Sequence, residues 1–387
     1  MSSDSSGPSG PSGSPETASG SPSVFRRLVA RALLLGVGIG VALVSAEVLL
    51  RVRPSLLPEE ALLRLHWSGL EPPETITVAH PTCGYVHRPG ESHVMERDDF
   101  RFTLAADEYG FRNASPWPAA APVVAVGDSM TFSYGVDQPE MWTTLLATEL
   151  GAPVINLGID GGAPRQALRI YEEYARRASP EVVLFGVFPG NDYIDERTFE
   201  RWEASGDGGN YAIWRWYGGR QAAGVKQLLG RSYLLVGLRE ALKSYDHKGT
   251  TIDMPDGGRL RLAPGLIEGA MPPNVTAEDA QRLYDTVAEA RDVVEADGVS
   301  FVAMLFPTKE EIYLAAQGEP FPDGVGLLVS NLEQRDVLCL DLRPAMLAEV
   351  KEGATLFFET DGHPNAAGYV VIAKAVAGFL RDHELTD

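Results

Sequence analysis

The chain has 387 residues, 44% of them hydrophobic, which is enough for one large domain with additional segments. Its formal net charge of −20 excludes a protein that binds nucleic acid non-specifically, because phosphate backbones attract basic surfaces. The two cysteines, Cys83 and Cys339, are too few for a disulfide scaffold and form no CxxC zinc pattern. A single bridge between them stays open as an alternative to two free thiols.

The N-terminal segment has a composition typical of disorder. Residues 1–23 are almost all Ser, Gly, Pro and other small or polar residues. Such a segment buries too little apolar area on folding to offset its chain entropy. We therefore predict a disordered tail over residues 1–25.

An apolar run follows this tail. From Ala32 to Leu50 its only charge is Glu47, and its length matches the roughly 20 residues that cross a bilayer. We predict one transmembrane helix over residues 29–50, with the large C-terminal part extracytoplasmic. A cleaved signal peptide is one alternative, since Val44-Ser45-Ala46 offers small residues at a cleavage point, and a buried core helix is another.

Residues 51–118 are rich in Pro, Gly and His, and we predict an irregular leader there. A regular alternation of short apolar strands and helices then occupies residues 119–384. The expected strands are 123–126, 154–157, 182–187, 299–306 and 337–342, and the expected helices are 141–150, 166–177, 280–295 and 365–380. This alternation predicts a three-layer α/β/α domain with a central parallel sheet.

An insertion interrupts the alternation over about 197–276. Its aromatic residues include Trp202, Trp214, Trp216 and Tyr217. They fit either a substrate-facing subdomain or a packed helical insertion with a small core of its own.

Chemically distinctive residues follow the predicted strands, where open α/β sheets collect ligands. The blocks are Gly127-Asp128-Ser129, the glycine-rich stretch 156–162, Gly190-Asn191-Asp192 and Asp361-Gly362-His363. A serine on a strand-to-helix turn, an asparagine amide at a strand end and a close Asp–His pair are the groups that acyl transfer through a nucleophile requires. Asp128 and Asp192 are interpreted as structural carboxylates that accept loop N–H groups.

The four blocks resemble those of the SGNH (GDSL-type) hydrolases. The resemblance covers roughly residues 78–380, and Tyr109-Gly110-Phe111-Arg112 is similar to a leader motif of bacterial membrane-anchored members. It implies an SGNH/flavodoxin-like fold with Ser129 as nucleophile, His363 as base and Asp361 as the orienting acid. It also implies an oxyanion hole made of the Ser129 and Gly161 N–H groups and the Asn191 amide, with Gly161 a better match than Gly158.

One departure concerns the last block. Asp361 and His363 are two residues apart, whereas the usual family spacing is three. This spacing, and the stretch from Pro307 to Tyr313, is similar to alginate O-acetyltransferase-like proteins. The acyl acceptor is therefore open between water and a sugar hydroxyl.

Three functions follow as hypotheses. The first is a membrane-anchored serine esterase acting on acyl esters, acetyl esters above all, of a small molecule or an envelope glycan. The second is an O-acyltransferase that modifies a cell-surface polysaccharide, and the third is an inactive scaffold. No cofactor or metal is expected, since His87 and His93 are spaced too loosely for a metal pair and are interpreted as loop residues. The N-terminal helix is the expected contact with the membrane, and no nucleic-acid partner is expected.

Overall fold

The computed structural model describes residues 22–57, 61, 76–206, 208–217, 232–246, 251–254, 258–267 and 269–386. The chain divides into two compact units, Met1–Leu57 and Pro58–Asp387, and each is described by itself.

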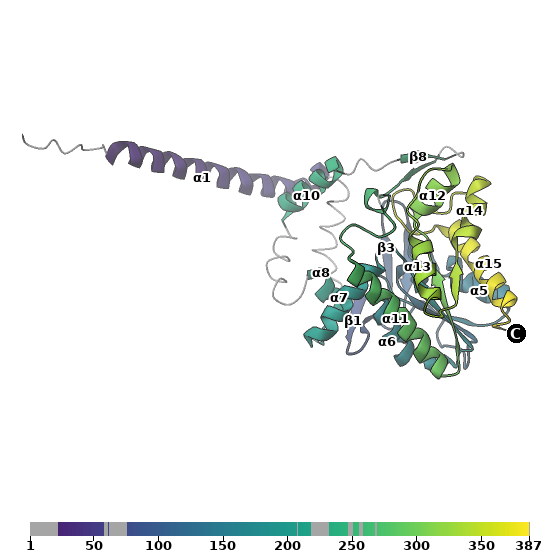
Figure 1. Ribbon diagram of the computed structural model, residues 1–387. Helices are drawn as coiled ribbons and strands as arrows, with labels where there is room; N and C mark the ends of the chain where they lie inside the picture. Colours follow the sequence, from purple (N-terminus) through teal and green to yellow (C-terminus); the bar gives the residue numbers. More distant parts are fainter. Residues whose placement is uncertain are drawn as a thin grey trace, which may run out of the picture. The chain divides into compact units, whose positions relative to one another are not determined.

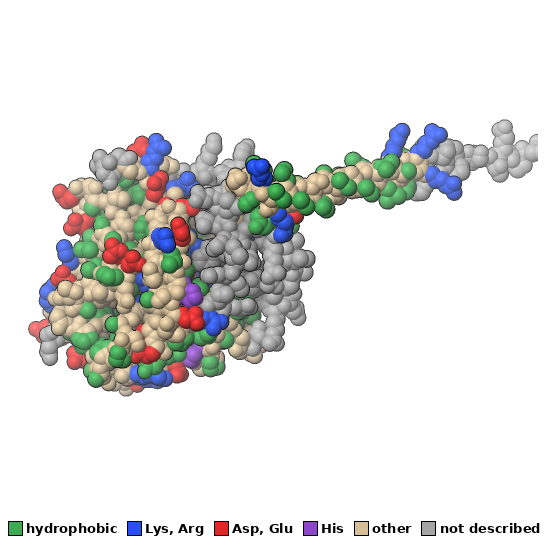
Figure 2. All heavy atoms as spheres, turned by 180° about the vertical axis from the view of Figure 1, so that it is seen from behind, with side chains coloured by type: hydrophobic (Ala, Val, Ile, Leu, Met, Phe, Trp, Pro, Cys, Tyr) green, Lys and Arg blue, Asp and Glu red, His purple; other side chains and the backbone are tan. Residues whose placement is uncertain are grey.

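The first unit is dominated by helix α1 (Pro22–Val52), followed by a short 3-10 turn, η1 (Pro54–Leu56). By length and composition the part of α1 from Arg26 to Val52 could cross a membrane, with a mean hydropathy of 2.3, although a signal sequence would have the same properties. Hydrophobic side chains cover it along its length and arginines gather near its start (Figure 2). The helix extends beyond the predicted span of 29–50 at both ends, so residues 22–25 are helical. The rest of the predicted disordered tail lies outside the described residues.

A five-stranded parallel sheet forms the centre of the second unit, in the order β11-β10-β7-β5-β6. Its strands are β5 (Val123–Gly127), β6 (Val154–Gly158), β7 (Val182–Val187), β10 (Ser300–Leu305) and β11 (Cys339–Asp341). Every residue of β5 and β7 is buried, as their continuous apolar runs require of inner strands covered on both faces. The predicted central parallel sheet is confirmed.

Helices pack against both faces of this sheet (Figure 1). One face carries α6 (Pro164–Glu173), α7 (Asp192–Ser205), α11 (Ala277–Ala296) and α13 (Gly324–Glu333). The other carries α5 (Trp142–Leu150), α12 (Lys309–Gln317), α14 (Arg343–Lys351) and α15 (Ala366–Asp382). Along β5, Val124 and Val126 join the first core cluster, and Val123 and Ala125 join the second. This period of two is the side-chain alternation of a strand, and it confirms the three-layer architecture.

The leader is more regular than predicted. Two antiparallel hairpins occupy much of it, β1 (Thr77–His80) with β2 (Gly84–His87) and β3 (Ser92–Glu96) with β4 (Arg101–Ala105). The second hairpin buries Phe102 and Leu104 in a third core cluster together with Phe132 and Tyr134. The leader therefore packs directly beside the turn that follows β5. His87 and His93 lie in these strands, which corrects their interpretation as loop residues.

The described part of the insertion contains α8 (Tyr211–Tyr217), α10 (Tyr233–Asp246), β8 (Thr251–Asp253) and β9 (Arg259–Arg261), while α7 continues to Ser205. Trp202 and Tyr211 are buried in the core on the α6 face of the sheet, and Trp214 packs against it. These aromatics thus extend the main core and form no separate one. The side chains of Trp216 and Tyr217 lie outside the described residues.

The alternative left open for the cysteines is also resolved: Cys83 and Cys339 are both free. Burial raises the pKa of each thiol to about 12, so neither is a reactive thiolate at neutral pH.

The contact between β6 and the short helix α4 (Ser129–Phe132) generates a prediction. A Cβ at Gly158 would collide with the backbone of Thr131 and Phe132, which cannot rotate away as a side chain would. Gly158→Ala should therefore destabilise the protein by roughly 1–3 kcal/mol.

Gly378→Ala in α15 is the control, because nothing lies within 4 Å of the added methyl group. Replacing a helical glycine there should stabilise the protein by about 0.5–1 kcal/mol. Urea denaturation of the full chain in detergent measures both variants. Equal midpoints for Gly158→Ala and the native protein would contradict the steric argument.

Candidate active site

Ser129 begins helix α4 immediately after β5. Asp128 is the N-cap of this helix, and its Oδ1 accepts the backbone N–H of Met130 at 3.0 Å. Ser129 is only 7% exposed, so its hydroxyl lies in a largely water-excluded position at the end of a buried strand. The strand-to-helix turn predicted for the nucleophile is present.

His363 connects this serine to Asp361. The distance from His363 Nε2 to Ser129 Oγ is 2.8 Å, and from His363 Nδ1 to Asp361 Oδ1 it is 2.6 Å. The same Asp361 oxygen accepts the backbone N–H of His363 at 2.8 Å. The two-residue spacing therefore lets one carboxylate orient both the backbone and the ring of the histidine. The three predicted catalytic residues meet in the order nucleophile, base and orienting acid.

The charges of this pair stabilise each other. Burial opposes protonation of His363, but the hydrogen bond and ion pair with Asp361 outweigh it and raise the pKa of the imidazole above 6.5. Burial also opposes ionisation of Asp361, and the contact with His363 outweighs it and lowers the pKa of that carboxyl. With the Nδ1 proton directed at Asp361, the unprotonated Nε2 of the neutral ring faces the Ser129 hydroxyl as a hydrogen-bond acceptor.

Lys309 holds the loop that carries the pair. Its Nζ donates to the carbonyls of Phe358 and Glu359, each at 3.2 Å, and of Asp361 at 2.9 Å. The side chain is buried, so these three acceptors replace its hydration. Lys309 lies within the stretch from Pro307 to Tyr313 singled out in the sequence, but nothing there indicated this role.

Asp99, in the turn between β3 and β4, holds the same loop from the other side. Its Oδ2 accepts the backbone N–H groups of Thr360 and Asp361 at 2.6 and 2.7 Å, and the Thr360 hydroxyl at 2.8 Å. No local sequence signal could have identified Asp99, because its partners are more than 260 positions away.

Arg112, the last residue of the Tyr-Gly-Phe-Arg motif, supports the nucleophile side. Its buried guanidinium donates to the carbonyls of Phe132 at 3.2 Å, Ser133 at 3.0 Å and Val136 at 2.6 Å. It also lies over the rings of Phe102 and Phe132, at 5.0 and 4.8 Å from their centroids. The motif therefore secures the end of the helix that Ser129 begins.

The predicted oxyanion residues lie at one edge of the sheet. Strand β5 is flanked by β6 and β7, all parallel, so the loops carrying Ser129, Gly161 and Asn191 emerge side by side. Gly161 has a φ of +70°, a conformation that favours glycine. Asn191 is the N-cap residue of α7, and its Nδ2 donates to Asp195 Oδ2 at 2.7 Å, which uses one of its two amide hydrogens. Their role as oxyanion donors stays a prediction.

Asp128 and Asp192 both accept backbone N–H groups, consistent with a structural role. Asp192 Oδ2 accepts that of Phe188 at 2.7 Å. Burial raises the pKa of Asp128 to about 6, and burial followed by the charge of Asp128 raises the pKa of Asp192 well above its usual value.

Metal ligation finds no support within the described ranges, where no group of three or more His, Cys, Asp or Glu side chains is placed to hold an ion. His87 stacks on the ring of Phe132 at 5.3 Å, and burial lowers its pKa to about 4, so it is a neutral core residue.

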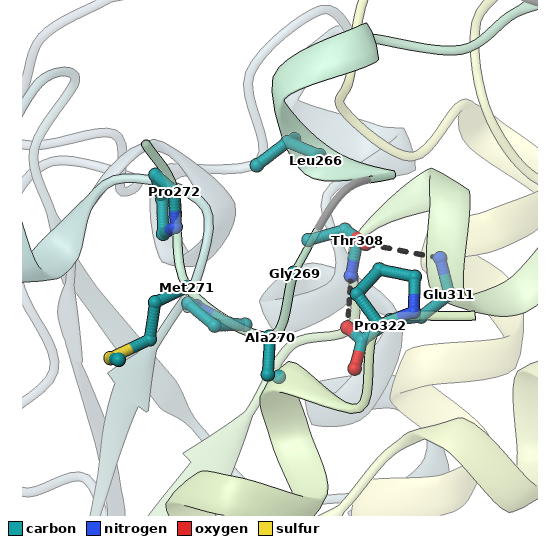
Figure 3. Close-up of a pocket in the computed structure, with 10 residues that line it drawn as sticks. Leu266, Gly269, Ala270, Met271, Pro272, Thr308, Glu311 and Pro322 are labelled. Carbon is teal, nitrogen blue, oxygen red and sulfur yellow. Dashed lines mark hydrogen bonds between the residues drawn. The ribbon is translucent and has the colours of Figure 1, made fainter. Parts of the chain in front are cut away.

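Figure 3 shows a small pocket near the start of α12. Its lining includes Met271, Pro272 and the pair Thr308 and Glu311. Thr308 N donates to Glu311 Oε2 at 2.9 Å and Glu311 N donates to Thr308 Oγ1 at 3.1 Å, a capping box that begins the helix. The cavity of about 10 Å³ has room for roughly one water molecule, so it is not a substrate site.

Comparison with known proteins gives one family match. Residues 268–387, which include Asp361 and His363, match the model of the SGNH hydrolase-like domain of the acetyltransferase AlgX. The search of curated proteins returned no match.

The search of solved structures returns distant matches, among them two lipolytic proteins and an esterase. A member of the lipolytic protein G-D-S-L family from Veillonella parvula has a TM-score of 0.34 and 12% identity, over 67% of this chain and 97% of that one. The lipase/acylhydrolase from Enterococcus faecalis has a TM-score of 0.35 and 15% identity, over 67% of this chain and 95% of that one. An acetyl-xylooligosaccharide esterase from Geobacillus has a TM-score of 0.34 and 16% identity, over 68% of this chain and 94% of that one. At these TM-scores we infer nothing about this chain from them.

The contact between Asp361 and His363 predicts a pH profile. In the catalytic arrangement predicted from the sequence, the neutral imidazole accepts the serine proton, so kcat/KM should fall on the acid side with an apparent pKa above 6.5. Asp361→Asn removes the charge that raises this pKa, so the acid limb should move to lower pH, and the maximal rate should drop roughly 10²–10⁴-fold. The measurement is p-nitrophenyl acetate hydrolysis between pH 4 and pH 9.

Glu359→Gln is the matched control, because that exposed side chain lies two residues from Asp361. It should leave the acid limb in place. An unchanged limb in Asp361→Asn would show that Asp361 does not set the basicity of His363.

Proposed function

We propose that the chain is an SGNH hydrolase-like protein and acts as a membrane-anchored, extracytoplasmic serine esterase that hydrolyses acyl esters, acetyl esters above all, of a small molecule or glycan. The observation that carries this proposal is the continuous contact from Ser129 Oγ through His363 to Asp361. An inactive scaffold would have no need of a buried imidazole whose two nitrogens both have partners.

In the proposed reaction, His363 Nε2 takes the proton of Ser129 as Oγ attacks the ester carbonyl. The imidazolium is stabilised by Asp361, and the negative oxygen is surrounded by the N–H groups of Ser129 and Gly161 and by the Asn191 amide. His363 then gives this proton to the alcohol as the alcohol departs, and the acyl group remains on Ser129. Water, deprotonated by the same imidazole, releases the acid and restores the hydroxyl.

A second candidate is acyl transfer to a sugar hydroxyl. It is favoured by the match to an acetyltransferase domain and by the Asp-x-His spacing. The first half-reaction would be the same, and only the acceptor that enters the second half-reaction would differ.

Helix α1 supports anchoring in a membrane through its length and apolar composition. A retained anchor and a cleaved signal sequence give proteins of different mass. Intact-mass measurement on protein from the producing cell distinguishes them, and a chain that starts near residue 47 would contradict the anchor.

The proposal predicts loss of activity when the nucleophile is removed. Ser129→Ala should lower kcat for p-nitrophenyl acetate by at least about 10³-fold while the protein stays folded. Ser330→Ala is the control, since that hydroxyl donates to the Gly326 carbonyl within α13 and should not affect the rate.

Acetyl transfer is measured in the same assay by adding a neutral oligosaccharide and separating free acetate from acetylated sugar. A dominant sugar product would favour the transferase. Equal rates in Ser129→Ala and the native protein would exclude both reactions at this serine.

A further inference from the structure

A single guanidinium in the insertion contacts two elements of the candidate site. Arg215, in α8, donates through one terminal nitrogen to the carbonyl of Gly161. Through the other it donates to Asp195 Oδ1 at 2.7 Å. The planar fork of an arginine holds two such acceptors at a fixed separation.

Asp195 transmits this contact to the asparagine. Its Oδ1 is bound by Arg215, and its Oδ2 accepts Asn191 Nδ2 at 2.7 Å one helical turn earlier. The Asp195 side chain is 4% exposed, so both bonds are formed away from bulk water. A continuous set of hydrogen bonds therefore runs from Gly161 through Arg215 and Asp195 to Asn191.

The peptide on the other side of Gly161 is fixed as well. The Gly161 N–H belongs to the peptide whose carbonyl is that of Asp160, and this carbonyl accepts the hydroxyl of Tyr85. Because a trans peptide points its N–H opposite to its C=O, the bond from Tyr85 sets the direction of the Gly161 N–H. Tyr85 and Arg215 thus hold the two peptides that flank Gly161.

Space at Gly161 is consistent with this arrangement. A Cβ there would lie 3.0 Å from Arg215 Nη1, so the guanidinium packs directly over the glycine. The ring of Tyr85 stacks with Tyr211, one turn before Arg215 in α8, at 6.2 Å between centroids. Helix α8 is therefore docked against the loop after β6 through both side chains.

We infer that Arg215 is a positioning residue of the oxyanion hole and that it holds Gly161 and Asn191 at a fixed distance and orientation relative to each other. In the same arrangement, Tyr85 fixes the peptide that presents the Gly161 N–H. The inference deepens the proposed function and rests on it. Preorganised donors stabilise the transition state more than the bound ester, so losing their alignment lowers kcat more than it raises KM.

The test compares Arg215→Ala, Tyr85→Phe and Arg169→Ala in the full chain in detergent. Arg169 is the matched control: its side chain is 29% exposed against 32% for Arg215 and also binds α7, through Glu203, but it contacts neither predicted donor. Arg215→Ala and Tyr85→Phe should lower kcat for p-nitrophenyl acetate roughly 10–10³-fold per folded molecule, with KM within about twofold. Arg169→Ala should retain native kcat.

Chemical rescue separates positioning from a merely structural role. Guanidinium at low millimolar concentration should restore part of the kcat of Arg215→Ala and leave Tyr85→Phe unchanged. Native kcat in Arg215→Ala, or in Arg215→Lys if the alanine variant does not fold, would overturn the inference while Ser129→Ala still established the esterase. An inactive native protein would overturn the proposed function and the inference together.

Discussion

Ser129, the proposed nucleophile, lies on a helix too short to be stable alone, and side chains from other segments satisfy part of the helix backbone. The carbonyls of Ser129 and Met130 accept the backbone N–H groups of Tyr134 and Ser133, but those of Thr131 and Phe132 have no partner within the helix. Trp142 Nε1 donates to the Met130 carbonyl at 3.3 Å, and Asn156 Nδ2 donates to that of Thr131 at 2.8 Å. The Arg112 guanidinium donates to the carbonyls of Phe132 and Ser133. Buried side-chain donors from three separate parts of the chain thus supplement the few backbone hydrogen bonds that so short a helix makes.

The sequence was sufficient to predict the frame of the molecule and the ends of its strands. Four of the five strands, β5, β6, β7 and β10, are largely buried apolar runs, and such runs are visible without any partner. Strand β11 is only Cys339–Asp341, shorter than the predicted 337–342. Because parallel strands end at one edge, Ser129, Gly161 and Asn191 could be placed together from topology alone. The Asp-x-His block could be paired with the serine only through its resemblance to a known family.

The supporting residues could not be predicted in this way, since their signals are not local. The strands of the leader are four or five residues long and are interspersed with His, Gly and charged residues, which weakens their period. Asp99 and Arg215 resemble ordinary surface charges in the sequence. Their partners come from other segments, and only the folded chain shows that one holds the histidine loop and the other the loop after β6.

The wide separation of Ser129 and His363 along the chain, 234 positions, has a consequence for biosynthesis. At about 5–20 residues per second, a ribosome needs roughly 10–50 s to proceed from the serine codon to the histidine codon. Throughout that interval the proposed base is absent, and α15, against which α5 packs, has not yet been made. The proposed chemistry can therefore begin only after His363 has been synthesised, so a shorter nascent chain would lack the proposed esterase activity.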